Sequence, residues 1–390
     1  MSAPVIVSAV RTAIGTARKG TLANTDGETL ASAIVEETVR RSGLEPQRFD
    51  DILLAESQYG GGDLARYAAV VNGMLDVPGV ALNRHCAGSL TSIGLAAASV
   101  QSGMESALVA GGVQATSMAP RLRQRVAGTA DEYADWYPAS HPNSPEAPNF
   151  DMSISVGWNT VKAVGITREE QDAWACRSHQ RAVAAIDAGK FADEIVPLKL
   201  DGPGGAPVEF AVDEHPRRDT SLARLASLKV LHPEIPGFSI TAGNSSGIND
   251  AAAAVAVTGA EVAFDEGLTP LAKILAWGAA GVDPALMGFG ALRAADKVLR
   301  RAGLTYADVT LWEINEAFAA VPIAACKEFG LDEERVNFSG SGCSLGHPVA
   351  ASGARMVVTL VHELRRRGGG LGLATMCAGG GQGGAVLIEV

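Results

Sequence analysis

The sequence predicts an α/β fold in which a mostly parallel sheet is covered by helices on both faces. Its 390 residues are 47% hydrophobic and 19% charged, a composition typical of soluble globular proteins. Short apolar segments alternate with helical ones, as expected when parallel strands are connected by helices. The same order of segments also occurs twice, and the length allows one large unit built from duplicated halves.

In the first half, a β-branched run at residues 5–7 predicts the opening strand. Residues 28–42 place apolar side chains on one helical face and stop at Gly43, which predicts a helix. Residues 51–55 and 107–110 are short apolar runs and predict two further strands. An Ala-rich helix is expected at 90–101, just before the last of these strands.

The second half repeats this plan. Helical spacing is found at 292–303 and 350–366, and strands are expected at 309–312 and 372–376. Asn83-Arg84-His85-Cys86 precedes a helix, a strand and a glycine turn, and Leu345-Gly346-His347-Pro348 precedes the same series. This order predicts two similar half-domains whose reactive residues lie at corresponding helix starts.

The middle of the chain, residues 118–247, interrupts the alternation and is rich in Pro, Asp, His and Arg. Within it, 167–189 is helical, with Thr167 and Glu170 spaced as a capping box. A long excursion of this kind usually forms a lid or a binding subdomain.

Composition also narrows the function classes. A formal net charge of −11 argues against nucleic acid or an anionic membrane as the partner, so an anionic small substrate would need local arginines. Five scattered cysteines without CxxC pairs disfavour a disulfide framework or a zinc site and favour a reducing cytosol. No signal peptide, sorting signal or bilayer-spanning apolar run is expected.

Cys86 is a candidate nucleophile because it lies where a helix is expected to begin. Unpaired backbone N–H groups and the helix dipole favour a thiolate there, and the small residues Ala87, Gly88 and Ser89 leave room for an acyl group. Taken by itself, such a cysteine is more often a buried structural residue.

Three other residues are candidates on similar terms. His347 stands in Gly-His-Pro before a helix, where it could be catalytic or a satisfied structural histidine. Cys377 opens a glycine-rich run that could aim N–H groups at a ligand oxygen or simply connect two strands tightly. Asn315 follows a strand and could hold a water or a carbonyl group, or only form a turn.

In combination these segments resemble the thiolase family along nearly the whole chain. The matching segments, in the family's order, are Arg11-Thr12-Ala13-Ile14-Gly15, Asn83-Arg84-His85-Cys86, Ala110-Gly111-Gly112-Val113, Gly165-Ile166-Thr167-Arg168-Glu169-Glu170-Gln171-Asp172, Thr241-Ala242-Gly243-Asn244-Ser245-Ser246-Gly247-Ile248-Asn249-Asp250, Asn315-Glu316-Ala317-Phe318, Leu345-Gly346-His347-Pro348 and Cys377-Ala378-Gly379-Gly380-Gly381-Gln382-Gly383.

The resemblance implies a thiolase-like fold, with two duplicated βαβαβαββ half-domains in a layered α-β-α-β-α core and an added loop domain. The N-terminal half would comprise residues 1–117 with 248–268, and the C-terminal half residues 269–390. Residues 118–247 would form the loop domain that covers CoA.

It also implies an acyl-CoA acyltransferase that carries out reversible thiolysis of 3-ketoacyl-CoA, or Claisen condensation of acetyl-CoA. Cys86 would hold the acyl group as a thioester, and His347 would take its proton. Cys377 would be the second acid/base, since a thiol pKa is close enough to neutrality to be tuned. Asn315, through a water, and His347 would form one oxyanion site, and the backbone N–H groups of Cys86 and Gly379 the other.

The implied substrates are acyl-CoA and CoA, with no permanently bound cofactor and no metal. Their binding would involve the following residues: Arg217 and Ser246 near the nucleotide and pantetheine, and Met152, Ala242, Ala317 and Phe318 along the tunnel. The resemblance further implies a cytoplasmic homodimer or homotetramer in fatty acid metabolism or β-oxidation.

Departures from the family's usual pattern occur after Cys86, after Met152 at 153–158, at 339–344 and at Gly290-Ala291-Leu292. None removes a catalytic group, but the change after Met152 could alter the acyl pocket. Three alternatives remain: a ketoacyl-synthase-like condensing enzyme, an inactive thiolase-like scaffold and a cysteine hydrolase. CoA-dependent cleavage of acetoacetyl-CoA distinguishes them from a thiolase.

Overall fold

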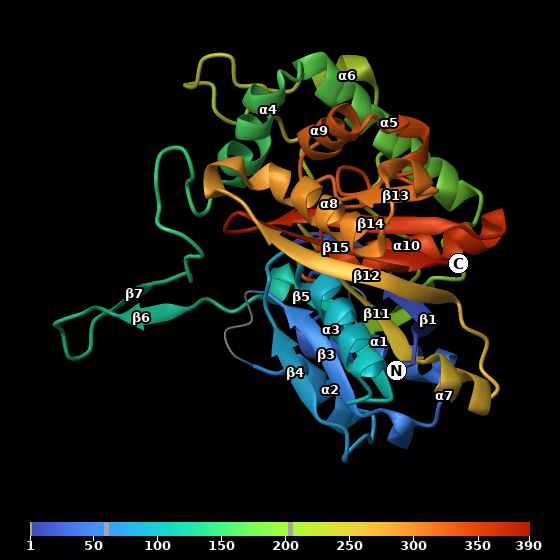
Figure 1. Cartoon of the computed structure of the whole chain (residues 1–390). Helices are drawn as coiled ribbons and strands as arrows, with labels where there is room; N and C mark the ends of the chain where they lie inside the picture. Colours follow the sequence, from blue (N-terminus) through green and yellow to red (C-terminus); the bar gives the residue numbers. More distant parts are fainter. Residues whose placement is uncertain (1, 58–61, 202–205) are drawn as a thin grey trace.

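The computed structural model describes residues 2–57, 62–201 and 206–390, and a mixed β-sheet runs through its centre (Figure 1). The strands follow one another in the order β13-β14-β15-β12-β1-β11-β5-β3-β4. Their bounds are β1 Pro4–Thr12, β3 Asp51–Glu56, β4 Gly79–Leu82, β5 Ala107–Ala115, β11 Asn249–Gly259, β12 Ala272–Gly281, β13 Leu311–Ile314, β14 Leu371–Ala378 and β15 Gln382–Glu389. Two short strands, β2 (Gly15–Thr16) and β8 (Ile195–Val196), pair with β11 and β1.

The two halves of this sheet have the same topology. In the N-terminal half, β1 pairs antiparallel with β11, β11 antiparallel with β5, and β3 pairs parallel with both β5 and β4. In the C-terminal half, β12 pairs antiparallel with β15, β15 antiparallel with β14, and β14 parallel with β13. A parallel bridge between Trp312 and Val336 occupies the position that β4 has in the first half. The halves meet where β1 pairs with β12, at Val5–Lys273 and Ile6–Ala272.

The prediction of a mostly parallel sheet was wrong. Strands β1, β11, β12 and β15 each run antiparallel to their named neighbours, apart from the short β8 beside β1. In the C-terminal half the reason is local: β14 turns directly into β15 through glycines, and Gly380 and Gly381 have φ of 81° and 73°. A turn this short can join only antiparallel neighbours.

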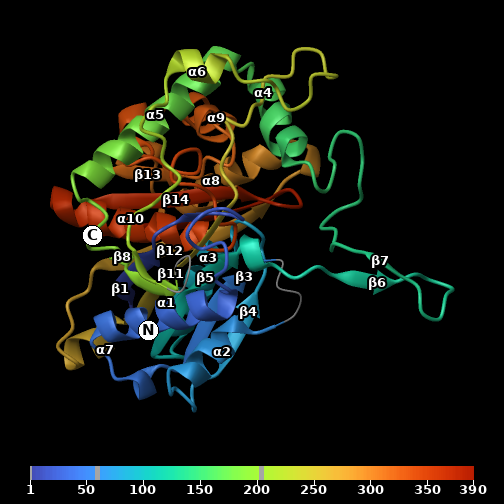
Figure 2. The same cartoon turned by 180° about the vertical axis from the view of Figure 1, so that it is seen from behind.

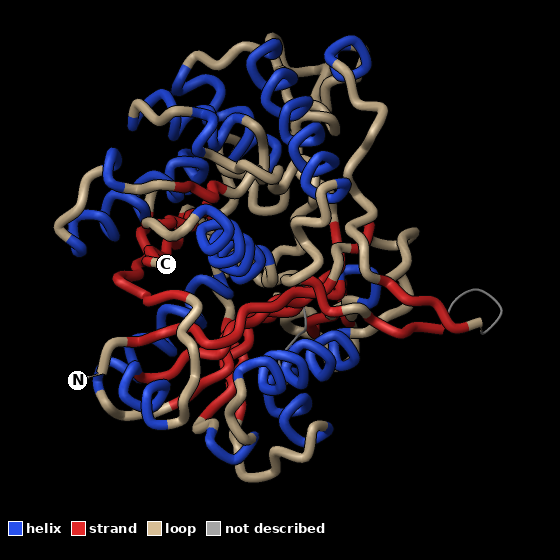
Figure 3. Tube along the Cα trace, turned by 90° about the vertical axis from the view of Figure 1, so that its right-hand side faces the viewer, coloured by secondary structure: helices blue, strands red, loops and turns tan. Residues whose placement is uncertain are grey.

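Helices form three layers around the strands (Figure 3). Helices α1 (Gly27–Ser42) and α2 (Leu64–Val71) share a core with the N-terminal half. Helices α8 (Gly290–Ala302) and α9 (Ala320–Phe329) share another with the C-terminal half. Helices α3 (Gly88–Ser102) and α10 (Ser352–Arg367) lie in the third core with strand residues from both halves. The α-β-α-β-α layering is therefore present.

Most predicted elements are confirmed, with small changes at their ends. The Asp26 side chain caps α1 by accepting from the N–H of Thr29, and Gly43 ends the helix at φ 77°. Helix α5 (Arg168–Asp187) begins with the expected capping box of Thr167 and Glu170. Strand β5 continues five residues beyond the predicted end. Strand β13 begins only at Leu311, because a 3₁₀ turn at Tyr306–Asp308 precedes it.

Residues 118–247 leave the layered core and return to it. The hairpin of β6 (Arg123–Arg125) and β7 (Tyr133–Asp135) projects away from the rest of the molecule (Figures 1 and 2). The remaining elements of this segment are the π-helix η3 Ser153–Trp158, α4 Asn159–Val164, α5, β9 Leu198–Asp201, β10 Pro207–Phe210 and α6 Leu222–Ala226. The chain then re-enters the N-terminal half as β11, followed by α7 (Ala260–Asp265).

Buried polar contacts hold this segment against both halves. Arg11 on β1 is fully buried and forms salt bridges of 2.7 Å with Glu194 and with Asp213. On the other side, Glu316 accepts hydrogen bonds from Trp174 Nε1 at 2.8 Å and from Ser178 Oγ at 2.6 Å. These contacts fix α5 and the segment around residues 213–217 relative to the layered core.

Candidate active site

Cys86 lies in the short connection between β4 and α3, where a sharp backbone turn presents its sulfur. The preceding residue, His85, has a φ of 45°, an uncommon conformation for a residue with a side chain. Asn83 Oδ1 accepts from the His85 N–H at 2.8 Å, and the His85 carbonyl accepts from the N–H of Gly88 at 3.0 Å. Helix α3 starts at Gly88, so the nucleophile candidate stands just before the helix, as predicted.

Two backbone N–H groups face the sulfur of Cys86. One belongs to Cys86 and the other to Gly379, in the turn between β14 and β15. Gly379 therefore lies beside Cys86, although 293 residues separate them in the sequence. Two converging N–H donors at a nucleophile can stabilise the oxyanion that forms when the nucleophile attacks a carbonyl group.

Cys377 is the last reactive side chain of β14 and pairs with Gly383 on β15. It is buried, and its sulfur is close enough to Cys86 for the charge of Cys86 to raise the pKa of Cys377. Burial, with Cys86 second, raises the pKa of Cys377 far above the ordinary thiol value. The pKa of this thiol is thus tuned upward, so Cys377 is a neutral thiol near neutral pH.

The expectation of a Cys86 thiolate at the helix start is also corrected. Burial raises the pKa of Cys86 to about 11, although the two N–H groups act in the opposite direction. The stabilisation offered by a helix start is confined to its first turn and is smaller than the cost of desolvating the sulfur. Cys86 is therefore a neutral thiol near neutral pH.

His347 lies immediately before α10, and its backbone N–H donates to Asn249 Oδ1 at 3.0 Å. Its ring Nδ1 is 2.6 Å from Ser352 Oγ. The Ser352 hydroxyl donates its single proton to the Pro348 carbonyl at 2.9 Å, so it must accept from His347 Nδ1–H. The lone pair of the ring is then on Nε2, which is the arrangement a general base requires.

Burial, followed by the charge of Arg355, lowers the pKa of His347 to about 4. The ring is consequently neutral and able to accept a proton near neutral pH. Helix α10 lies against α3, and the N–H of Ala354 donates to Ser89 Oγ at 2.9 Å. His347 and Cys86 therefore precede two helices, α10 and α3, whose first turns are in contact.

Asn315 follows β13 and is fully buried. Its backbone N–H donates to the Thr375 carbonyl at 3.0 Å, and its Nδ2 is 3.5 Å from both ring nitrogens of His347. Within the described residues its Oδ1 accepts no hydrogen bond. An amide with spare hydrogen-bonding capacity beside the histidine can hold a water or a substrate oxygen.

The residues predicted to line a tunnel are brought together in part. The N–H of Ser246 donates to the Ala317 carbonyl at 2.9 Å, and Ser245 forms an antiparallel bridge with Phe318. Ala242 is exposed at the start of this strand-like segment, whose other end, Ile248, forms a parallel bridge with His347. Met152 packs against the same hydrophobic core as Ala317 and Phe318, at the beginning of the π-helix.

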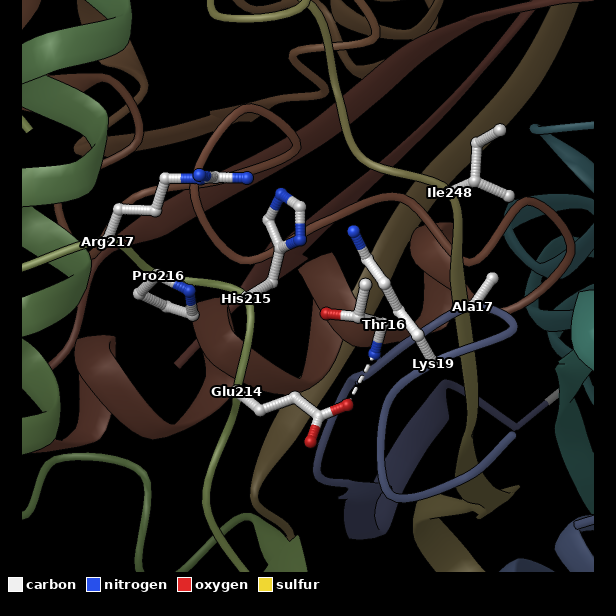
Figure 4. Close-up of a pocket in the computed structure, with 8 residues that line it drawn as sticks. All are labelled: Thr16, Ala17, Lys19, Glu214, His215, Pro216, Arg217 and Ile248. Carbon is white, nitrogen blue, oxygen red and sulfur yellow. Dashed lines mark hydrogen bonds between the residues drawn. The ribbon is translucent and has the colours of Figure 1, made fainter. Parts of the chain in front are cut away.

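Arg217 lines a cavity of about 390 Å³ between the 213–217 segment and the N-terminal half (Figure 4). Lys19 and Arg217 reach toward the two sides of the His215 ring there, and neither forms a salt bridge within the described residues. At the edge of the cavity, the Glu214 carboxylate accepts hydrogen bonds from the N–H of Thr16 at 2.6 Å and from the N–H and hydroxyl groups of Thr21. Exposed Ile248 lines the inner side, so this basic cavity adjoins the segment that leads to His347.

Sequence reasoning missed Lys19, His215, Ser352 and His85. Lys19 is some 200 residues from Arg217, and only the fold brings the two to one cavity. For Ser352 a signal existed: it lies five residues after His347, in the turn that begins the next helix. The positive φ of His85 has no sequence signal beyond the tolerance of histidine for this conformation.

Across residues 2–57, 62–201 and 206–390, no helix is long and apolar enough to cross a bilayer. The same residues contain no group of three or more His, Cys, Asp or Glu side chains that could hold a metal ion.

Comparisons with known proteins agree with this architecture. The thiolase N-terminal domain family matches residues 4–261, and the thiolase C-terminal domain family matches residues 268–390. An acetyl-CoA acetyltransferase of Escherichia coli K12 is 40% identical, covering 99% of this chain and 98% of that protein. A 3-ketoacyl-CoA thiolase of Bacillus subtilis is 36% identical over the full length of both chains.

A third relative, a 3-oxoadipyl-CoA/3-oxo-5,6-dehydrosuberyl-CoA thiolase of Escherichia coli K12, is 38% identical and covers 98% of each chain. Among solved structures, the acetyl-CoA acetyltransferase of Bacillus anthracis superposes with a TM-score of 0.91 at 40% identity, covering 100% of this chain and 99% of that one. The chain therefore belongs to the thiolase family of acyltransferases and has the thiolase fold.

Proposed function

We propose that Cys86 carries the acyl group during reversible thiolysis of 3-ketoacyl-CoA. One observation supports this assignment above others: the N–H groups of Cys86 and Gly379 converge on the sulfur of Cys86, and the Cys377 thiol lies beside it. A hydrolase needs the nucleophile and the oxyanion donors. Only a reaction that also moves a proton at carbon needs a second acid/base in that position.

In the first half-reaction, His347 Nε2 takes the proton of Cys86 as its sulfur attacks the C3 carbonyl of the substrate. The oxyanion at C3 is stabilised by the N–H groups of Cys86 and Gly379. The C2–C3 bond then breaks, and the electron pair moves to C2 and its thioester oxygen. Asn315, through a water, and His347 stabilise this enolate, and Cys377 delivers its proton to C2.

In the second half-reaction, the Cys377 thiolate takes the proton of an incoming CoA thiol. The CoA sulfur attacks the thioester on Cys86, and the C–S bond to Cys86 breaks. His347 returns its proton to the departing sulfur, so all three groups regain their initial states. Condensation of acetyl-CoA is the reverse sequence.

For the CoA moiety, we assign its phosphates to the cavity lined by Lys19, His215 and Arg217, whose two cations form no salt bridge with any residue that the structure describes. The pantetheine arm would follow Ser246 and Ile248 toward His347, with Ala242, Ala317, Phe318 and Met152 as its apolar surroundings. This placement uses the basic cavity to bind an anionic substrate on a protein with a net charge of −11.

The remaining assignments are broader. We assign the chain to fatty acid metabolism in the cytoplasm, with CoA thioesters as substrates and no permanently bound cofactor. A homodimer or homotetramer is expected, and the projecting β6–β7 hairpin offers it a contact surface.

The test is CoA-dependent cleavage of acetoacetyl-CoA, followed by a panel of 3-ketoacyl-CoA substrates of graded length that includes dicarboxylic ones. Cys86→Ser should abolish cleavage while leaving the circular dichroism spectrum and the melting temperature unchanged. Folded wild-type protein that cleaves none of the panel would favour an inactive scaffold. Hydrolysis without a need for CoA would favour a cysteine hydrolase, and transfer only from a carrier protein a ketoacyl-synthase-like enzyme.

A further inference from the structure

His85, the residue before the nucleophile, is held in an unusual position by contacts on three sides. Its φ of 45° turns the chain so that the next N–H, that of Cys86, faces the sulfur. Its own N–H and carbonyl groups are both engaged, with Asn83 and Gly88. Its side chain therefore leaves the turn in one fixed direction.

The ring of His85 packs directly on Gly379. A Cβ atom placed on Gly379 would lie 3.1 Å from both Cγ and Cδ2 of the ring, tighter than an ordinary contact. The glycine turn that follows has positive φ at Gly380 and Gly381 and has no side chain of its own to restrain it. The imidazole ring is thus a direct steric support for Gly379.

Ser140 holds the other edge of this ring. Its Oγ is 3.0 Å from His85 Nε2, and a Cβ on Gly380 would lie 2.7 Å from the Cβ of Ser140. Burial lowers the pKa of His85, so the ring is neutral and places no positive charge beside the sulfur. A ring and a serine from two distant segments therefore enclose the turn that carries Gly379.

We propose that His85, supported by Ser140, is a positioning residue that sets the separation of the Cys86 and Gly379 N–H donors. This inference rests on the proposed role of these two N–H groups as an oxyanion hole. Because hydrogen-bond strength falls steeply with distance and angle, small displacements of Gly379 weaken stabilisation of the oxyanion. Alkylation of the sulfur forms no oxyanion, so the Gly379 N–H acts on it only by lowering the pKa of Cys86, and alkylation depends less on this geometry than acylation does.

The experiment compares acylation with alkylation in three variants. His85→Asn removes the ring but retains a residue that tolerates positive φ. Ser140→Ala removes only the hydrogen bond to the ring. Ser144→Ala is the matched control, since Ser144 lies in the same segment and its hydroxyl accepts from the N–H of Ala147 rather than from His85.

For each variant, acetyl transfer from acetyl-CoA to Cys86 is measured by rapid quench. Iodoacetamide labelling of Cys86 is followed separately by peptide mass spectrometry. We expect His85→Asn to slow acetyl transfer about 10- to 100-fold, below the 10²- to 10³-fold cost of deleting a donor outright. Ser140→Ala should slow it about 3- to 10-fold. The KM for acetyl-CoA and the alkylation rate should stay within about twofold in both, and Ser144→Ala should match wild type in every measurement.

Equal slowing of acylation and alkylation in His85→Asn would place its effect on the nucleophile itself and overturn the inference. An acetyl transfer rate equal to that of the wild type in either His85→Asn or Ser140→Ala would also overturn the inference. If His85→Asn does not fold, the acylation and alkylation rates of Ser140→Ala are compared with those of Ser144→Ala, and this comparison tests the inference by itself. Wild-type protein that never acylates Cys86 would instead refute the proposed function, so the two failures are distinguishable.

Discussion

The hydrogen bond between His347 Nδ1 and Ser352 Oγ predicts a large effect for a substitution that does not touch the substrate, Ser352→Ala. The contact is 2.6 Å long and both residues are buried. Ser352 Oγ accepts a hydrogen bond from His347 Nδ1–H and donates one to the Pro348 carbonyl. Alanine removes the acceptor that keeps the ring proton on Nδ1.

The size of the effect follows from the tautomer. A buried N–H left without a partner costs about 1–3 kcal/mol, and the Nδ1–H tautomer bears this cost after the substitution. The Nε2–H tautomer has no lone pair on Nε2 and cannot take the Cys86 proton as the proposed mechanism requires. Since 1.4 kcal/mol is a factor of ten in an equilibrium, the reactive population and kcat should fall about 5- to 100-fold. The free energy of unfolding should fall by only about 1–2 kcal/mol.

The assay is thiolysis of acetoacetyl-CoA, with kcat and KM determined separately, together with urea unfolding. Ser92→Ala is the control: Ser92 is a fully buried serine on α3 that donates to the Gly111 carbonyl at 2.8 Å. It should lose comparable stability while keeping kcat within about threefold. If Ser352→Ala keeps wild-type kcat, or if Ser92→Ala loses as much activity, the tautomer argument is refuted.

Three further predictions address other parts of the site. Cys377→Ala should still form the acyl-enzyme but lose α-proton exchange of acetyl-CoA in deuterated water, and normal condensation by this variant would remove its assigned role. The kcat/KM for acylation should not change between about pH 5 and 9. His347 and Cys86 are both neutral between their pKa values of about 4 and about 11, and His347 becomes protonated below the lower value. A fall in kcat/KM on the acidic side near pH 6.5 would contradict this prediction. Lys19→Gln should raise the KM for CoA about 3- to 10-fold without changing kcat, whereas Lys199→Gln, an exposed cation on β9, should change neither.

The fold was predictable where local chemistry decides it. Asp26 and Gly43 bound α1, and Thr167 with Glu170 starts α5, because capping depends on residues within a few positions. Strand direction was not predictable in this way. Apolar runs such as β11 and β15 have the same pattern in parallel and antiparallel pairs. The turn at Gly379–Gly381 determines the direction of β15, and no local feature of this kind determines that of β11.

The site was predictable only from several segments together. The resemblance selected Cys86, His347, Cys377, Asn315 and Gly379. In the structure the Gly379 N–H faces the Cys86 sulfur, the charge of Cys86 raises the pKa of Cys377, and Asn315 lies beside His347. The supporting residues have no comparable sequence pattern. Ser352 acts through a single hydrogen bond and Lys19 through a cavity shared with distant residues, so both depend on tertiary geometry.

The protonation states of Cys86 and His347 determine how the proposed acylation step can proceed. With a thiol at a pKa of about 11 and an imidazole at about 4, an ion pair between Cys86 and His347 is disfavoured before substrate arrives. Proton transfer must then accompany attack, when negative charge moves from the sulfur to the carbonyl oxygen between two N–H groups. In the proposed mechanism the oxyanion hole, rather than a preformed thiolate, consequently provides the stabilisation that makes acylation favourable. In this mechanism a neutral Cys86 thiol reacts only slowly with electrophiles that form no oxyanion, and its acylation depends on the position of Gly379.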